Sequence, residues 1–147
     1  MKIYLASPFF NEKQVALVEE LEGIFGAHEL FSPRKEGVMT VMTPAERKAM
    51  APQLFKSNYE HIDWCDILFA VIDDRDVGVA WELGYAFACG KFIVTFTNAG
   101  HGLNIMLGEC SSAHLKGTDQ ARQFSVLLHT HPFESACRHF DTAESVT

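Results

Sequence analysis

Residues 66–86 constrain the fold of this chain more than any other stretch. Residues 67–72 form an apolar run of the length and composition of a strand that is buried on both faces. An acidic turn follows at residues 73–76, and residues 77–89 then have the apolar spacing of a helix. A buried strand that leads through a short turn into a helix is typical of a parallel sheet. In such a sheet ligands bind just outside the carboxyl ends of the strands, where this acidic turn would lie.

Glu82 is a candidate nucleophile because of its position in that helix. It lies about one turn in, among apolar and small residues, where a solvated helix rarely has a lone carboxylate. Gly78 and Gly84 would let a ligand or another backbone approach it closely. For Asp73 and Asp74 a structural role is the better explanation, because carboxylates at a helix N-terminus contribute about 0.3–1 kcal/mol each and Asp is a common cap.

The rest of the chain repeats the alternation of strands and helices. Strands are expected at residues 2–6, 28–31, 67–72, 92–96 and 112–115, and helices at residues 11–25 with Asn11 as cap, 44–65 with a possible break at Pro52, 77–89, 104–108 and 118–128. This order predicts an α/β fold: an open parallel sheet of about five strands, with helices on both faces. Residues 1–128 would form this domain, and residues 129–147 a C-terminal tail whose structure the sequence does not specify.

Composition and charge exclude several classes of partner. With 48% hydrophobic and 21% charged residues, the 147-residue chain has the composition of a soluble globular protein. A net charge of −7 and a pI near 5.4 argue against nucleic acid and against an anionic membrane surface as partners. No apolar run approaches the roughly 20 residues of a membrane span. We therefore expect a small substrate that is not strongly anionic.

The cysteines and the N-terminus indicate a cytoplasmic protein. The four cysteines include no Cys-x-x-Cys pair and lie mostly among apolar residues, as reduced thiols do. Pro8 and the charged residues after it interrupt the first apolar run too early for a secretory leader.

The loop after the first expected strand favours an apolar planar ligand. Residues 7–11 lack the glycine-rich phosphate cradle of dinucleotide-binding and P-loop proteins. They carry Phe9 and Phe10 instead, which either contact a ligand or pack as a hydrophobic staple on the first helix. Of the two, Phe10 is expected to face the site.

Five segments occur in an order that is specific to one family. They are residues 3–10, 31–34, 66–69, 76–86 and 103–106. In this order they resemble the nucleoside 2-deoxyribosyltransferases over residues 1–117. The most specific segment is the Gly-x-x-x-Glu-Leu-Gly run at residues 78–84, which a sister group of deoxynucleoside-monophosphate glycosidases shares. The resemblance implies a flavodoxin-like fold and an enzyme of nucleoside salvage that moves 2-deoxyribose between free nucleobases without a cofactor.

The resemblance also implies a retaining double displacement at Glu82. The carboxylate would attack the anomeric carbon of a 2'-deoxynucleoside and expel the base, and a second base would attack the covalent intermediate. A carboxylate suits this role because it stabilises an oxocarbenium-like transition state and then traps it, as in retaining glycosidases. Tyr4 matches the family's strand-one tyrosine, which would aim Glu82 and keep it ionised; alternatively, Tyr4 is a core residue with its hydroxyl at the sheet edge.

Five further residues are expected to bind the substrate. Asp76 matches the family's sugar-binding acid, and Asn104 matches an amide that enters the site from a neighbouring subunit; both would bind deoxyribose hydroxyls. Met106 would pack beside Asn104, Gly78 would allow close approach, and Phe10 would contact the base. By sequence alone Asn104 would be a turn or cap residue. The family resemblance implies a homo-oligomer, a hexamer built from dimers, with sites completed across each dimer.

Two departures from the family pattern are present. Where the family usually has an Asp that contacts and protonates the leaving base, this chain has Asn58. An amide can hydrogen-bond a base but cannot act as a general acid, so the preference for purines, pyrimidines or both stays open. Many family members also end in an aromatic residue whose terminal carboxylate helps the site, whereas this chain continues through His129 to Thr147 without an equivalent.

Other functions remain as alternatives. One is a 2'-deoxynucleoside 5'-monophosphate N-glycosidase with water as the acceptor, although the charge of Asp76 would repel a phosphate. Another is a non-catalytic nucleoside-binding module, against which the joint presence of Glu82, Tyr4 and Asp76 argues. The histidines and the cysteine of the tail match no zinc spacing, so no metal site is expected.

Overall fold

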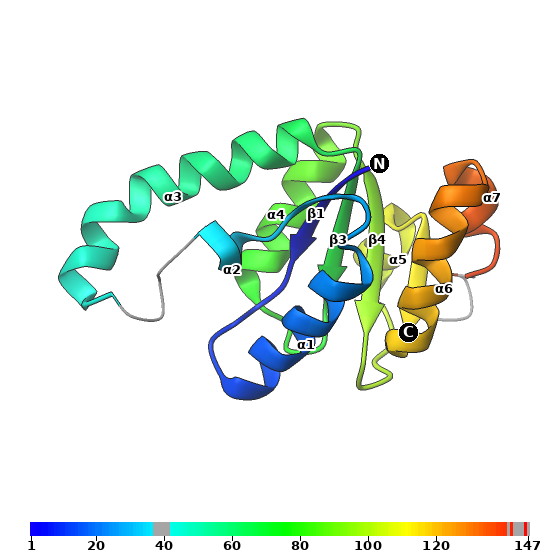
Figure 1. Ribbon diagram of the computed structural model, residues 1–147, viewed down its shortest axis with the longest axis horizontal. Coiled ribbons are helices and arrows are strands. Elements are labelled where there is room, and N and C mark those ends of the chain that lie inside the picture. The colour runs from blue at the N-terminus through cyan, green and yellow to red at the C-terminus, as the bar shows by residue number, and fades with distance from the viewer. Residues whose placement is uncertain (37–41, 141, 143–145, 147) are drawn as a thin grey trace.

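Five parallel strands form the centre of the protein (Figure 1). The computed structural model describes residues 1–36, 42–140, 142 and 146. The strands are β1 (Lys2–Ala6), β2 (Glu29–Phe31), β3 (Ile67–Val71), β4 (Phe92–Thr97) and β5 (Ala113–Lys116), in the order β2-β1-β3-β4-β5. Every pair is parallel. The predicted flavodoxin-like α/β fold is therefore confirmed.

The helices cover both faces of the sheet, as predicted. They are α1 (Glu12–Ile24), α2 (Pro33–Glu36), α3 (Pro44–Trp64), α4 (Val77–Ala88), α5 (Ile105–Cys110), α6 (Gly117–Thr130) and α7 (Phe133–Cys137). Asn11 caps α1, as expected, by accepting a hydrogen bond from the Gln14 amide. The short helix α2 was not predicted from the sequence.

The possible break at Pro52 is absent, because α3 is one continuous helix of 21 residues that includes this proline. Pro52 and Lys48, whose carbonyl loses its helical hydrogen bond there, are both exposed, so water can replace the missing donor. A capping box between Thr43 and Glu46 starts the helix. Side chains from Pro44 to Gln53 are exposed apart from the partly buried Met50, and this half of α3 projects beyond the sheet (Figure 1).

Alternation along the strands divides the core into two clusters. On one face Leu5, Phe69 and Phe96 pack with α1, α6 and α7. On the other face Tyr4 and Leu68 pack with α3 and α4. Because neighbouring strand residues point to opposite faces, Tyr4 lies on the α4 side while Leu5 lies under α1.

The strand order places a topological switch point between β1 and β3. The chain winds from β1 to β2 in one direction and then crosses back to β3 on the other side of β1. The loops that follow β1 and β3 therefore diverge at the carboxyl edge of the sheet, and this switch point is the usual ligand site of open α/β sheets.

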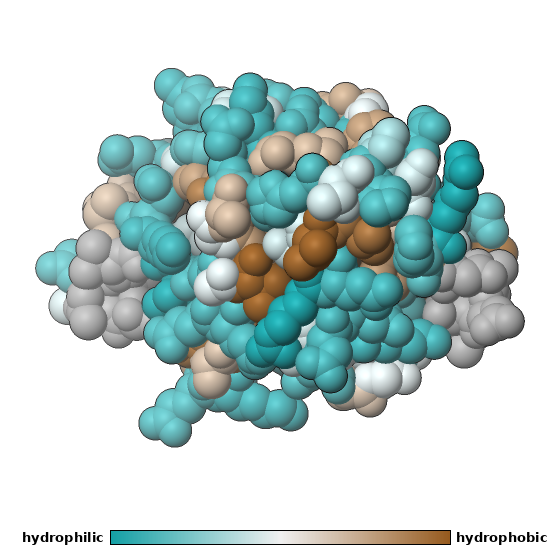
Figure 2. Space-filling model, turned by 45° about the vertical axis from the view of Figure 1, so that its right-hand side comes forward, coloured by the Kyte–Doolittle hydropathy of each residue, from teal (hydrophilic) through white to brown (hydrophobic). Residues whose placement is uncertain are grey.

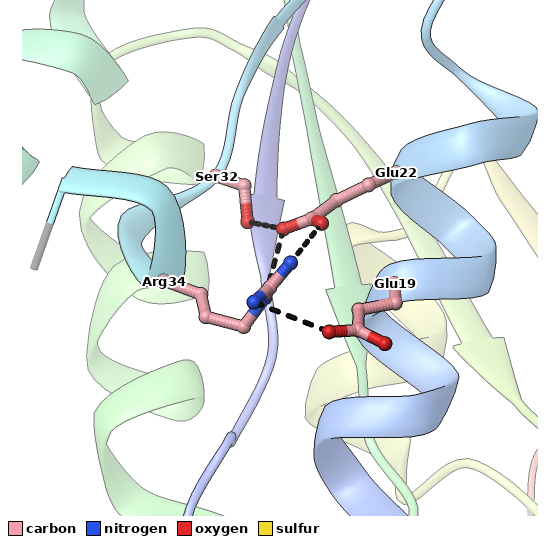
Figure 3. Close-up of polar contacts among 4 residues, drawn as sticks. All are labelled: Glu19, Glu22, Ser32 and Arg34. Carbon is pink, nitrogen blue, oxygen red and sulfur yellow. Dashed lines mark hydrogen bonds and ion pairs between the residues drawn. The ribbon is translucent and has the colours of Figure 1, made fainter. Parts of the chain in front are cut away.

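A buried ion pair fixes the segment that follows β2 to α1 (Figure 3). The carboxylate of Glu22, only 6% exposed, accepts hydrogen bonds from Ser32 Oγ at 2.7 Å and from Arg34 Nη2 at 2.5 Å. Arg34 also pairs with Glu19 at 3.5 Å. Because a buried carboxylate is costly without partners, these contacts hold the start of the β2–α3 connection in one place.

The chain after α6 returns to the body of the protein. Ala136, Cys137 and Phe140 are buried in the cluster under α1 and α6. Val146 pairs with Leu103 in a parallel bridge and lies against Gly108, where any side chain would collide with it.

The surface seen when α6 is turned toward the viewer is mostly hydrophilic, with a small hydrophobic group near its middle (Figure 2). Among the described residues no helix combines the length and hydrophobicity that crossing a bilayer requires.

Candidate active site

A hydrogen bond between Tyr4 and Glu82 lies at the centre of the candidate site. Tyr4 Oη donates to Glu82 Oε1 at 2.6 Å, which joins the inner strand β1 to α4. The ring of Tyr4 is fully buried and packs against Phe31 with centroids 5.3 Å apart, and Phe31 in turn stacks on His61 at 3.6 Å. Packing thus fixes the donor before any ligand binds.

The electrostatics of the pair follow from burial. Burial raises the pKa of Glu82 to about 7; the hydrogen bond from Tyr4 opposes this rise, and the charge of Asp76 adds to it. Burial and the neighbouring Glu82 carboxylate raise the pKa of Tyr4 far above its ordinary value, so Tyr4 remains a proton donor. The hydrogen bond from Tyr4 thus favours the ionised form of Glu82, and burial has the larger, opposite effect on its pKa.

Asp76 caps the helix that carries Glu82. Its Oδ1 accepts a hydrogen bond from the Val79 amide at 2.9 Å. A Cβ built on Gly78 would lie 2.9 Å from the same oxygen, closer than real Cβ contacts allow. Glycine at position 78 therefore leaves the Asp76 carboxylate undisturbed and the first turn of α4 open to approach.

Asn58 lies on the face of α3 that packs against α4. It is partly buried, one turn before the fully buried Ile62 and one turn after Phe55. Ile62 belongs to the same cluster as Tyr4, and Phe55 contacts Trp81, the neighbour of Glu82, with centroids 5.3 Å apart. Because residues three and four apart share a helix face, Asn58 lies on the side of α3 toward the Glu82 helix.

Phe10 is exposed in the loop after β1. Its ring is 71% exposed and stacks on the partly buried Phe9 at 5.5 Å. The loop begins at the carboxyl end of β1, next to the switch point between β1 and β3.

Asn104 and Met106 lie on the far flank of α4 from Glu82. Asn104 Oδ1 caps α5 through the Leu107 amide at 2.9 Å, and Met106 is 75% exposed. Asn104 and Asp76 both line a cavity of about 440 Å³ between α4 and α5, whose lining does not include Glu82. Within one chain, therefore, Tyr4, Glu82 and Asp76 come together with Asn58 opposite, while Asn104 shares a cavity with Asp76 but not with Glu82.

Asp73 and Asp74 connect the turn after β3 to its neighbours. Asp73 accepts hydrogen bonds from the Asn98 amide at 2.8 Å, the Ala99 amide at 3.1 Å and the Thr97 hydroxyl. Asp74 accepts one from Gln14. Gln14 was not predicted as a site residue, although Asn11-x-x-Gln14 has the spacing of a capping box.

Comparison with known proteins identifies the family. The pattern of the family described as nucleoside 2-deoxyribosyltransferase matches residues 3–127. The chain belongs to this family. A 2-deoxyribosyltransferase structure from Bacillus psychrosaccharolyticus is 32% identical, with a TM-score of 0.77 over 92% of this chain and 96% of that one. Family membership indicates an enzyme that acts on nucleosides and either transfers their sugar or cleaves their glycosidic bond.

More distant comparisons show the fold alone. A CMP N-glycosidase from Clostridium botulinum is 19% identical, with a TM-score of 0.55 over 88% of this chain and 98% of that one. No curated protein sequence matches the chain significantly.

The chemistry available at the site is that of a carboxylate with a fixed hydrogen-bond donor. In the part of the chain that the structure describes, no three His, Cys, Asp or Glu side chains are grouped to hold a metal ion. A partly desolvated carboxylate can attack an electrophilic carbon once it is ionised, and Tyr4 fixes which of its oxygens is engaged.

Glu82→Gln is expected to stabilise the fold at about pH 8 and to leave its stability unchanged near pH 4.5. Since the folded pKa of Glu82 is raised to about 7, its favourable contribution to stability is complete below the ordinary value of 4.5 and is lost as pH rises through about 7. Glutamine keeps an acceptor for Tyr4 without the charge, so the gain in free energy of unfolding above pH 7 should be on the order of 3 kcal/mol. Urea denaturation at the two pH values measures it. The exposed Glu134→Gln is the control, and an equal effect of Glu82→Gln at both pH values would contradict the burial argument.

Proposed function

We propose that this protein is a nucleoside 2-deoxyribosyltransferase that moves 2-deoxyribose between nucleobases through a covalent deoxyribosyl–Glu82 intermediate. The observation that carries the proposal is the buried Tyr4–Glu82 hydrogen bond at the switch point of the sheet. The family match over residues 3–127 supports it.

The first half of the reaction uses the ionised form of Glu82. Because Tyr4 binds Oε1, we assign the attack on the anomeric carbon to Oε2. The bond from carbon to the base nitrogen breaks, and the base leaves with the electron pair and takes a proton from water. Asn58 orients the base by hydrogen bonds but has no proton to give at neutral pH.

The second half reverses these steps with a new base. A ring nitrogen of the acceptor attacks the anomeric carbon, the bond to Glu82 breaks, and the acceptor loses its proton to water. Both displacements invert the carbon, so the product retains the configuration of the substrate. The stacked rings of Phe9 and Phe10 offer an apolar surface to either base.

The charge of the site favours nucleosides over their monophosphates. We place Asp76 at the 5' end of the sugar, where its carboxylate can accept a hydrogen bond from a hydroxyl. A 5'-phosphate there would meet a like charge, which Glu82 would reinforce.

A second copy of the chain would complete the site. The exposed apolar side chains near the first turns of α4 and α5 are Val77 at 85%, Ile105 at 64%, Met106 at 75% and Trp81 at 47%. Such a patch beside polar site residues is typical of an interface. A twofold dimer through this face would place Asn104 and Met106 of one subunit beside Glu82 of the other, and a hexamer would assemble from such dimers.

Incubation with deoxyinosine and adenine is expected to yield deoxyadenosine and hypoxanthine. Glu82→Ala should form no product, while Glu134→Ala, which removes an exposed carboxylate of α7, should keep full activity. Intact mass should show a 2-deoxy-2-fluoropentosyl adduct on the wild type with a slow 2'-fluoro-substituted nucleoside. Base release from a deoxynucleoside monophosphate without an acceptor would establish the N-glycosidase instead, and binding without any product would establish the non-catalytic module.

Asn58→Asp is expected to raise the rate for substrates whose base must be protonated to leave. General acid catalysis is worth about 10²–10⁴-fold, and the amide of Asn58 cannot supply it. The gain should be largest for purines and should fall as pH rises through the pKa of the new acid. Initial rates across a pH series measure this. A lower rate on every base without new pH dependence would show that Asn58 is not at the base.

Two inactive variants are expected to restore each other if the sites are shared. Glu82→Ala lacks the nucleophile, and Asn104→Ser keeps a capping oxygen for α5 but loses the amide. In an equal mixture reassembled from separated subunits, half of the dimers are mixed and each has one intact site, so activity should return to about one quarter of wild type. Either variant reassembled alone is the control, and a mixture without activity would rule out sharing.

A further inference from the structure

The side chain of Gln14 connects the loop after β1 to the turn after β3. Its Oε1 accepts a hydrogen bond from the Phe10 amide at 2.7 Å, and its Nε2 donates to Asp74 Oδ2 at 2.8 Å. Its own amide is bound to the Asn11 cap at 2.9 Å, which fixes its backbone in the first turn of α1. One partly buried amide thus contacts the loop after β1 and the turn after β3 at once.

The turn that Gln14 contacts is held from its other side as well. Asp73 receives three hydrogen bonds from residues 97–99, at the end of β4 and just beyond it. Directly after the two attached residues Asp73 and Asp74, Arg75 has a φ of 50°, a left-handed conformation that costs energy in a residue other than glycine. Such a backbone persists only where its surroundings over-determine it; the hydrogen bonds of Asp73 and Asp74 constrain the chain before this residue, and the Asp76 cap of α4 constrains it afterwards.

We propose that Gln14 is a positioning residue that holds the Phe9–Phe10 loop in a fixed place relative to the turn that carries Asp76. This inference rests on the proposed function for its consequence: the loop carries the aromatic surface for the base, and the turn carries the carboxylate for the sugar. The gap between them must match a nucleoside, and Gln14 sets it.

The chemistry of the bridge allows a donor and acceptor exchange as a test. In Gln14→Glu the donor to Asp74 is lost and two carboxylates face each other. In Asp74→Asn the bridge survives, because the new amide oxygen still accepts from Gln14. In the double variant Gln14→Glu/Asp74→Asn the direction of the bond reverses: the amide at position 74 donates to one Glu oxygen, and the other accepts from Phe10.

Exchange of the Phe10 amide hydrogen, followed by NMR, reads the bridge without any enzyme assay. Relative to wild type we expect about tenfold faster exchange in Gln14→Glu and in Gln14→Leu, and values near wild type in Asp74→Asn and in the double variant. Unchanged melting temperatures exclude general unfolding. Equal exchange in all five proteins, or a double variant as fast as Gln14→Glu, would overturn the proposal.

Steady-state kinetics then read the consequence for the site. We expect the KM for the deoxynucleoside to rise about tenfold in Gln14→Glu with little change in kcat, and to return toward wild type in the double variant. Faster exchange with an unchanged KM would show that the bridge does not position the site. An inactive wild type would overturn the proposed function, while the exchange rates would still decide whether Gln14 holds the loop.

Discussion

The hydrogen bond from Tyr4 to Glu82 is the interaction on which the candidate site depends. A carboxylate this far removed from water is costly, and one fixed donor offsets only part of that cost. The donor itself is held by Phe31 and by the sheet, so its position is determined by the core rather than by a loop. The site is therefore built into the hydrophobic cluster of one sheet face, and substitutions in that cluster are expected to alter the Tyr4–Glu82 hydrogen bond.

The acidic turn after β3 has three carboxylates within four residues, and each makes a different contact. Asp73 attaches the turn to the loop after β4, Asp74 attaches it to α1 through Gln14, and Asp76 starts α4. Asp73 and Asp74 thus attach the turn to other segments of the chain, whereas Asp76 caps α4 and its charge raises the pKa of Glu82. A strained backbone at Arg75 is the local cost of this arrangement.

The fold could be predicted well because buried parallel strands are short continuous apolar runs, as at Ile67–Val71. Pro52 was harder, since whether a proline ends a helix depends on whether water reaches the freed carbonyl. Glu82 was selected by its position in an apolar helix and Tyr4 and Asp76 by family resemblance; the structure does bring the three together, and their roles stay predictions. Neither the raised pKa of Glu82 nor the bridge at Gln14 could be read from the sequence, because both depend on burial and on contacts between distant segments.

The unequal burial of α3 has a consequence for how this protein can evolve. Its second half is constrained by the core through Ile62, and this register fixes where Asn58 lies. The side chains of its first half, from Pro44 to Gln53, are almost all exposed, so the core of the chain hardly constrains them. Selection on the single subunit should therefore act strongly on one half of a continuous helix and weakly on the other, so that substitutions accumulate in the projecting half while the position of Asn58 is kept.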